Sequence, residues 1–274
     1  MIDAEQIGQD AVTDYLSVSF SSTDYVGHIF GPSSLETEDN LLRLDRSLAD
    51  LFSYVDKRVG LKNVLIVLSA DHGCPEAPAY LNTFGIQAKY VSPEQWDKSP
   101  AIGDLKKKFG LGKELILSYS HPYVYLNRSL IQKRGLDQAV VEKAVVDELM
   151  KFDSVALAVS SKALGAGNLP NTPLIESVLR NFNSRRSGDI YVVFQPNYFI
   201  NDFDGLNVAV THGSPWRYDT FVPVVFAGGK LKAQHVYRSI ETVEIAPTLS
   251  AMVGAKPPSG SRSGPLPEVM NSRK

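Results

Sequence analysis

The strongest constraint on the fold is an alternation of short apolar runs with amphipathic segments of helical periodicity. The run NVLIVLSA at 63–70 is continuously apolar, as strands of a parallel sheet covered on both faces are. It follows residues 35–59, where leucine, phenylalanine and valine recur at helical spacing. An earlier β-rich run, YLSVSF at 15–20, predicts a strand before this helix. Strand, helix and strand in this order predict a right-handed βαβ unit.

The same alternation continues to the end of the chain. We expect strands at ELILSY, YVYL, SVALAV, DIYVVFQP and VPVVFAGG, and helices at 93–109, 136–151, within 171–182 and at IETVEIAPTLSAMVG. A Gly- and Asn-rich loop is expected at 201–207, and the Pro-, Gly- and Ser-rich tail from 256 is expected to be a surface extension. The prediction is therefore an α/β fold, with a largely parallel or mixed central sheet covered by helices on both faces.

Length and composition exclude several classes of protein. With 274 residues, 43% hydrophobic and 21% charged, the chain is large enough to bury a sizeable core, and one large domain is the expectation. A net charge of -2 gives no electrostatic reason to bind a nucleic-acid backbone as the main partner. No apolar run approaches the roughly 20 residues of a membrane helix. Cys74 is the single cysteine, so an intramolecular disulfide is excluded.

Three short segments combine histidine with carboxylate or glycine, and each lies next to a predicted strand. SSTDYVGH places Asp24 and His28 four residues apart in the loop after the first strand. SADHG places Asp71 and His72 directly after NVLIVL, and THGS places His212 in the loop before VPVVF. Because ligands gather in loops at the carboxyl ends of strands, we expect these segments to meet.

Neutral imidazole and carboxylate are the ligands of catalytic zinc, which keeps a position open for water or substrate. Asp24, His28 and His212 would form one three-ligand set, and Asp71 with His72 half of a second. Two metals about 4 Å apart can hold both the attacking and the leaving oxygens of a phosphoryl displacement. Such ligands also suit manganese or iron, although the mixed set favours zinc.

Each motif also has a purely structural alternative. A histidine after a strand, such as His212, is commonly a loop residue, and Asp71 could cap the following turn. The conjunction of Asp-x-x-x-His, Asp-His-Gly and His-Gly in this order favours a metal site over three independent loops. Arg217 and Tyr218 are expected to be solvated, and Asp219 to accept a hydrogen bond that orients a ligand histidine.

Long segments around these motifs resemble the alkaline phosphatase superfamily, specifically its bacterial zinc-dependent phosphomonoesterase and phosphodiesterase branch. They are SFSSTDYVGHIFGPSS, LIVLSADHGCPEAPAYL, VTHGSPWRYDTFVPVVFAGG and VYRSIETVEIAPTLSAMVGAKPPSG. The resemblance implies that Asp24, His28 and His212 bind one zinc, and that Asp71 and His72 bind another. It extends from about Asp14 to Glu268 and is weak at about 85–189, which suggests an irregular insertion there.

The match also departs from the family pattern. In relatives, an upstream strand supplies a further Asp, and a Thr or Ser near it is the nucleophile; too few residues precede Asp24 to contain both. Residues 1–274 are therefore expected to be the C-terminal portion of an alkaline phosphatase-like domain, with the N-terminal strands and the nucleophile absent. The other hydroxyls near the ligands, on Ser21, Ser22, Thr23 and Ser69, are expected to bond backbone groups, and Cys74 to pack as a small hydrophobe.

The function implied by this resemblance is hydrolysis of small phosphate monoesters with two zinc ions and a nucleophile outside this chain. The alternatives are a phosphodiesterase or nucleotide pyrophosphatase of the same superfamily, or a metal-binding module without catalysis. The start of the chain has no basic segment followed by an apolar core, as a signal peptide would. A periplasmic or secreted location is expected from the resemblance, and the oligomeric state is not predicted.

Residues outside the ligand set are given conformational roles. His121 and His235 match no ligand position, so a structural role is expected for both. Four glycines adjoin the ligand segments, where they would permit a positive φ or a close backbone approach. They are Gly27, Gly31, Gly73 and Gly213.

Overall fold

A computed structural model describes residues 1–111, 114–203, 205–228 and 230–272. Contacts divide the chain into two compact units. The first unit comprises Met1–Thr23, Glu38–Asp71 and Val222–Lys274, and the second comprises Asp24–Thr37 and His72–Phe221. Each unit is therefore discontinuous in sequence.

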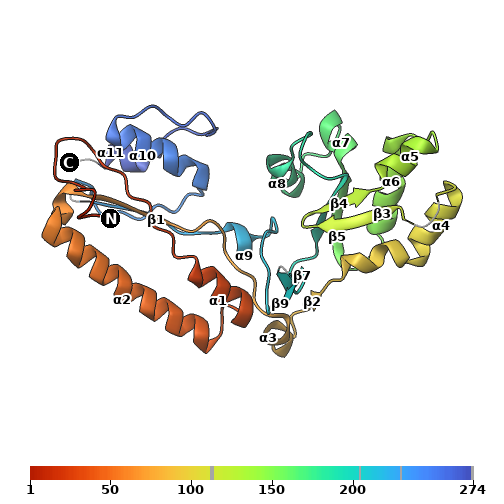
Figure 1. Ribbon diagram of the computed structural model, residues 1–274, viewed down its shortest axis with the longest axis horizontal. Helices are drawn as coiled ribbons and strands as arrows, with labels where there is room; N and C mark the ends of the chain where they lie inside the picture. The colour runs from red at the N-terminus through yellow and green to blue at the C-terminus, as the bar shows by residue number, and fades with distance from the viewer. Residues whose placement is uncertain (112–113, 204, 229, 273–274) are drawn as a thin grey trace. The chain divides into compact units, whose positions relative to one another are not determined.

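The first unit contains a two-stranded antiparallel sheet. β1 (Leu65–Ser69) pairs with β10 (Val224–Gly228), and Leu65 lies opposite Gly228. Figure 1 shows most of α2 (Leu35–Arg58) to one side of β1, and α10 (Ile245–Val253) and α11 (Pro267–Asn271) to the other. Short 3-10 turns at Leu61–Asn63 and Thr242–Glu244 precede β1 and α10. The long helix, the strand after it and the late helix are as predicted.

Two expectations for this region are wrong. Residues 15–20 form no strand, and β1 pairs antiparallel with a strand from the end of the chain, so the βαβ unit is not formed. The physical reason is that a strand needs a hydrogen-bonding neighbour, and none pairs with 15–20 among the described residues. The tail from 256 is more than an extension, because Leu266 and Val269 are buried in and before α11.

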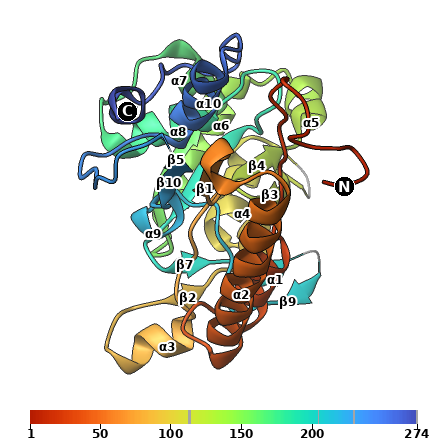
Figure 2. The same ribbon diagram turned by 90° about the vertical axis from the view of Figure 1, so that its left-hand side faces the viewer.

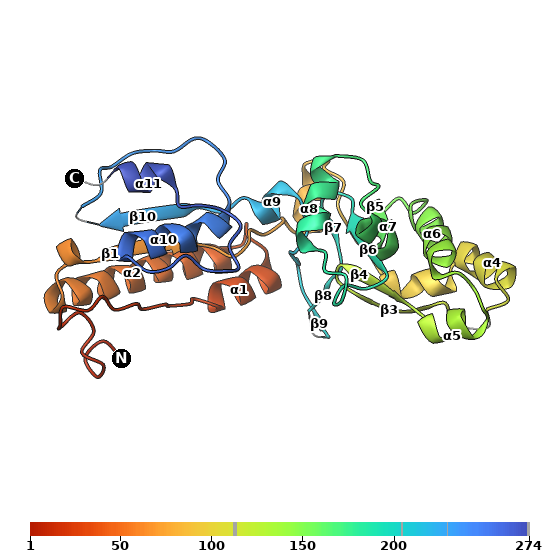
Figure 3. The same ribbon diagram turned by 90° about the horizontal axis from the view of Figure 1, so that it is seen from above.

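The second unit is built on a four-stranded antiparallel sheet in the order β3-β4-β6-β5. These strands are Ile116–Ser120, Tyr123–Leu126, Ile190–Phe194 and Val155–Ser160, respectively. Figures 1 and 3 show α4 (Pro100–Lys108), α5 (Arg128–Lys133) and α6 (Gln138–Leu149) to one side of this sheet. On the other side lie α7 (Ser161–Ala166) and α8 (Pro173–Asn181).

The central strand β6 explains why helices cover both faces. All five of its residues, IYVVF, are buried. Ile190, Val192 and Phe194 belong to one cluster of buried side chains, and Tyr191 and Val193 to another, because successive side chains of a strand point to opposite faces. The larger cluster also contains Trp96, together with Ile102 of α4 and Val145 and Leu149 of α6. The expected covering of both faces is confirmed for this sheet.

Proline divides the helix expected at 93–109. A 3-10 helix at Pro93–Lys98 is followed by α4, with Ser99 between them in an extended conformation. Pro100 excludes the helical conformation from the residue before it, and at the first helical position its missing N–H costs nothing. The Ser99 hydroxyl caps α4 by accepting a hydrogen bond from Ile102 N.

Short elements complete the second unit. β2 (Lys89–Tyr90) runs parallel to β7 (Tyr198–Phe199), as Figure 2 shows. The predicted loop at 201–207 contains a small hairpin of β8 (Asp202–Phe203) and β9 (Leu206–Asn207). Two short helices, α3 (Pro78–Thr83) and α9 (Arg217–Thr220), flank the ligand segments.

The α/β class is confirmed, and of the two alternatives expected for the sheet, largely parallel or mixed, the described residues show a mixed and mostly antiparallel arrangement. Their strands form four small sheets, and β2–β7 is the one parallel pair among them. The expected insertion at 85–189 lies within the second unit and stays a prediction. In the described part of the chain, no helix combines the length and the apolarity that crossing a membrane requires. The periplasmic or secreted location also stays a prediction.

Candidate metal centre

The first ligand pair lies on a helix and not, as predicted, in a loop. α1 (Ser22–Phe30) contains both Asp24 and His28. Residues four apart on a helix share one face, and Asp24 Oδ1 lies 3.5 Å from His28 Nε2. The Asp-x-x-x-His spacing therefore brings the two side chains together because it places them on the same face of the helix. Gly31 follows the helix at a φ of 83°, a conformation that favours glycine.

Hydrogen bonds between His28 and residues 209–210 bring the distant His212 to this helix. The main-chain oxygen of His28 accepts from Ala209 N at 2.8 Å. The His28 side chain is 3% exposed, and its Nδ1 lies 2.8 Å from Val210 O. Because a carbonyl oxygen only accepts, Nδ1 must carry the proton, and in the neutral ring Nε2 keeps a lone pair.

Three side chains converge at this point with the geometry of a metal site. His212 Nε2 lies 3.4 Å from Asp24 Oδ1, and the ligand atoms of Asp24, His28 and His212 all lie within 4.8 Å of one another. Among the described residues, no other group of three or more His, Cys, Asp or Glu side chains has this arrangement. It is the three-ligand set that the sequence predicted.

His72, predicted to belong to a separate site, approaches the same carboxylate. Its Nε2 lies 3.7 Å from Asp24 Oδ1, and its ring stacks on that of His212 at 3.3 Å between centroids. His72 Nδ1 lies 2.8 Å from Gly73 O, which fixes the same tautomer as in His28. Asp71 is exposed and is not one of the three converging ligands.

The turn after His72 is held against α9 by a close backbone approach. Gly73 N donates to Asp219 O at 2.7 Å. A Cβ atom at position 73 would clash with the main-chain oxygen of Tyr218. Only glycine therefore fits this part of the Asp-His-Gly motif, which accounts for one of the glycines that the sequence assigned a conformational role.

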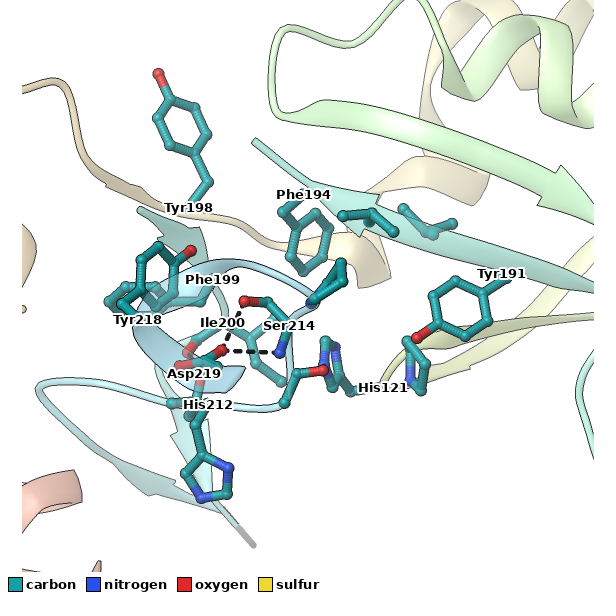
Figure 4. Close-up of a pocket in the computed structure, with 16 residues that line it drawn as sticks. His121, Tyr191, Phe194, Tyr198, Phe199, Ile200, His212, Ser214, Tyr218 and Asp219 are labelled. Carbon is teal, nitrogen blue, oxygen red and sulfur yellow. Dashed lines mark hydrogen bonds between the residues drawn. The ribbon is translucent and has the colours of Figure 1, made fainter. Parts of the chain in front are cut away.

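Asp219 is 4% exposed and organises the loop that carries His212. Its Oδ2 accepts from Ser214 N at 2.8 Å and from Ser214 Oγ at 2.6 Å, as Figure 4 shows. Its Oδ1 is buried without a hydrogen-bond partner among the described residues. Burial raises the pKa of this carboxyl, and the hydrogen bonds from Ser214 oppose that shift. The hydrogen-bond donor to the Asp219 side chain is thus Ser214, in the loop that follows His212.

His121 lies at the same loop, which the sequence did not reveal. Its Nε2 lies 3.2 Å from Gly213 O, and its Nδ1 2.7 Å from the Tyr119 hydroxyl. With His212 and Ser214 it lines a cavity of about 20 Å³ (Figure 4), enough for about one water. No local pattern indicates this contact, since 92 positions separate the two bonded residues.

Cys74 is unsuited to act as a thiolate. Burial, followed by the negative charges of Asp219, Asp24 and Glu76, raises the pKa of its thiol to about 12. The thiol is therefore protonated at neutral pH, which disfavours it as a nucleophile. This supports the packing role predicted for Cys74.

Two of the hydroxyls considered as nucleophiles have structural partners. Thr23 Oγ1 accepts from Asn40 Nδ2 at 3.2 Å, and Ser69 Oγ donates to Ala70 O at 3.2 Å. Ser22 begins α1 and Ser21 precedes it. Strand- and helix-end hydroxyls commonly bond in this way.

The donor set itself fits a transition metal. One carboxylate and two imidazoles whose Nε2 atoms face it provide borderline ligands, which zinc accepts with a position left for water or substrate. The ligands come from helix α1 and a glycine-containing loop, and backbone hydrogen bonds fix the His28 ring. Such support orients ligands before the metal binds.

Comparisons with known proteins find similar chains across most of this sequence. A family model described as type I phosphodiesterase / nucleotide pyrophosphatase matches residues 2–215. The chain is 34% identical over 270 residues to alkaline phosphatase PafA of Elizabethkingia meningoseptica, covering 98% of this chain and 48% of that protein. It is 34% identical over 261 residues to alkaline phosphatase PhoV of Synechococcus elongatus, covering 95% and 46%.

The solved structure of wild-type alkaline phosphatase PafA superposes with a TM-score of 0.87 at 34% identity. The superposition covers 98% of this chain and 50% of the PafA chain. The chain thus spans about half the length of the curated relatives that it matches.

Proposed function

The chain belongs to the type I phosphodiesterase / nucleotide pyrophosphatase family within the alkaline phosphatase superfamily, and from that membership we propose that it provides the metal-binding part of a phosphate-ester hydrolase. The observation that carries the proposal is the convergence of Asp24, His28 and His212 within 4.8 Å. The names of the relatives, both alkaline phosphatases, support the same reaction class.

Zinc is the proposed metal, held by Asp24, His28 and His212. When bound, zinc would supply a Lewis acid that polarises a phosphate oxygen. The chain's own part is to present imidazole nitrogens, with the Nδ1–H of His28 held by Val210 O so that Nε2 is the ligand atom, and to balance the cation with the Asp24 carboxylate. Asp71 and His72 are proposed ligands of a second zinc, which would bind more weakly because this chain offers it two side chains.

The nucleophile is proposed to lie outside these residues. The structural partners of Thr23 and Ser69 support this assignment. We therefore expect the chain alone to bind metal and phosphate with little turnover.

The proposed substrates are small phosphate monoesters, with phosphodiesters as the alternative within the same family. Support for monoesters comes from the phosphatase relatives, at 34% identity, and support for diesters from the family description. A comparison of p-nitrophenyl phosphate with bis(p-nitrophenyl) phosphate distinguishes the two wherever turnover is measurable.

The test measures binding of inorganic phosphate to the zinc-loaded chain by calorimetry, together with p-nitrophenyl phosphate hydrolysis. The variants are His212→Ala and, as a matched control from outside the site, His235→Ala. Phosphate binding that needs zinc and is lost only in His212→Ala supports the proposal. Turnover by the chain alone would show that a nucleophile lies within it and would refute that part. Zinc binding without any phosphate binding favours the module without catalysis.

A further inference from the structure

The peptide group between Gly213 and Ser214, one residue beyond the peptide group that directly follows His212, is held at both ends. Its carbonyl oxygen, Gly213 O, lies 3.2 Å from His121 Nε2. Its N–H group, Ser214 N, donates to Asp219 Oδ2 at 2.8 Å. Two side chains from distant parts of the chain therefore fix one peptide plane, which Gly213 connects to the backbone of the proposed ligand His212.

His121 acts here as a hydrogen-bond donor of defined tautomer. Gly213 O has no hydrogen to give, so His121 Nε2 carries the proton of this bond. In the neutral ring, Nδ1 then accepts from the Tyr119 hydroxyl, which lies 2.7 Å away. The ring also stacks on Phe194 at 6.3 Å between centroids. A hydroxyl and an aromatic ring therefore set the direction of the Nε2–H group.

The second contact ties the same peptide group to the His72 turn. Asp219 takes two hydrogen bonds from Ser214 through Oδ2, and its main-chain oxygen accepts from Gly73 N at 2.7 Å. Asp219 therefore links the residues that follow His212 and His72. These are the two histidines whose rings stack on each other.

Gly213 makes the close approach of His121 possible. Its φ is 104°, a conformation that other residues rarely adopt. A Cβ atom at this position would also lie 3.1 Å from His121 Nε2, which is tighter than an ordinary contact. The glycine of the His-Gly motif thus serves the contact with His121.

We propose that His121 and Asp219 are positioning residues, which clamp the Gly213–Ser214 peptide group and thereby orient the His212 imidazole for metal binding. The inference rests on the metal site proposed above and adds to it two residues that bind no metal. Partners of this kind commonly change metal affinity by about 10- to 100-fold. Both residues act through the backbone of the loop rather than through the imidazole itself.

The test measures zinc affinity of the full chain by competition with a chromophoric chelator. His121→Phe keeps a ring against Phe194 but removes the donor, and His121→Gln keeps an N–H donor without the ring. We expect zinc affinity to be about 10- to 100-fold lower than in the wild type for His121→Phe. For His121→Gln we expect an affinity much closer to that of the wild type. Asp219→Asn, which weakens acceptance from Ser214, is expected to lower affinity as well.

Two further measurements separate positioning from general destabilisation. The urea midpoint of each variant shows whether folding is intact, and the absorption spectrum of the cobalt-loaded chain reports coordination geometry. A changed spectrum with an unchanged midpoint supports the clamp. Wild-type affinity in both His121→Phe and Asp219→Asn would overturn it, while leaving the proposed function intact if His212→Ala still abolishes binding. If His212→Ala binds zinc as wild type does, the proposed function fails and the clamp with it.

Discussion

Two apolar strands of five residues, β1 in the first unit and β6 in the second, differ sharply in burial. Every residue of β6 is buried, whereas no residue of β1 is, and Leu68 is 45% exposed. The difference extends to the units. Both clusters of buried apolar side chains found in the described residues consist of second-unit residues alone.

An apolar sequence therefore predicts a strand but not how deeply the strand is covered. β6 has a hydrogen-bonded neighbour on each side and helices over both faces. β1 has β10 as its single partner among the described strands. Because burial of apolar surface is the main source of stability, the second unit should be the more resistant to unfolding, and the following predictions test this difference.

The largest effect is expected from Asp189→Ala in the second unit. Asp189 is 1% exposed and accepts hydrogen bonds from Leu126 N, Arg128 Nε and Gln138 Nε2. Removal of the carboxylate leaves Leu126 N and Gln138 Nε2 without this acceptor, at about 1–3 kcal/mol for each buried donor, so we expect a total loss of about 3–5 kcal/mol in unfolding free energy. Both tryptophans, at 96 and 216, lie in this unit, so their fluorescence in a urea titration reports it selectively.

Asp147→Ala is the matched control for that prediction. Asp147 pairs with Lys143 on an exposed face of α6 at 2.6 Å. Exposed pairs at this spacing contribute about 0.3–0.5 kcal/mol. An equal shift of the tryptophan transition in both variants would contradict the importance of the buried network.

Leu149→Ala and Leu42→Ala compare the same change in a helix of each unit. Leu149 of α6 is fully buried, and Leu42 of α2 is 55% exposed. Leu149→Ala should lower the unfolding free energy by about 2–5 kcal/mol because it leaves a cavity. Leu42→Ala should change the unfolding free energy by no more than about 0.5 kcal/mol. Circular dichroism, which detects both units, measures the pair; similar losses would remove the contrast between the units.

The sequence predicted the elements better than their pairing. Helical periodicity placed α2, α6 and α8, and apolar runs placed β1, β5, β6 and β10. The strand expected at 15–20 failed because pairing depends on a neighbour that periodicity cannot supply. The same holds for antiparallel β1–β10, whose residues are far apart in the chain.

The candidate site was partly predictable for the same reason. Asp24, His28 and His212 were found from short motifs, and the structure brings them together. His121 was not found, because its contact with Gly213 spans 92 positions and leaves no local pattern. Residues that orient ligands through the backbone are identified by geometry rather than by motif.

Gly103→Ala is expected to widen the difference between the units slightly. Gly103 lies in α4, and a Cβ atom there meets no other atom within 4 Å. Alanine in a helix is favoured over glycine by about 0.5–1 kcal/mol. The unfolding free energy measured from the tryptophan transition should therefore rise by that amount and the midpoint should move to higher urea, and an unchanged or lower midpoint would contradict the expectation.

The smallest effect concerns the acid sensitivity of the first unit. The hydrogen bond from Arg238 lowers the pKa of Glu268 from 4.5 to about 2. A carboxyl whose pKa is lowered by folding stabilises the fold at pH values above its pKa in the unfolded chain. This contribution is lost as the pH falls from about 4.5 to about 2. Arg238→Gln should therefore lower the melting temperature by a small amount at pH 6 and by less near pH 2. A difference that persists at pH 2 would contradict this origin.

The most direct test of the account is the zinc content of the purified chain, measured by elemental analysis after dialysis against a limiting zinc concentration. We predict about one tightly bound zinc per chain in the wild type and in His235→Ala, and none in His212→Ala, because His212 is one of three ligands that converge on one point. Equal zinc content in all three proteins, or none in the wild type, would contradict the assignment of Asp24, His28 and His212 as the metal centre.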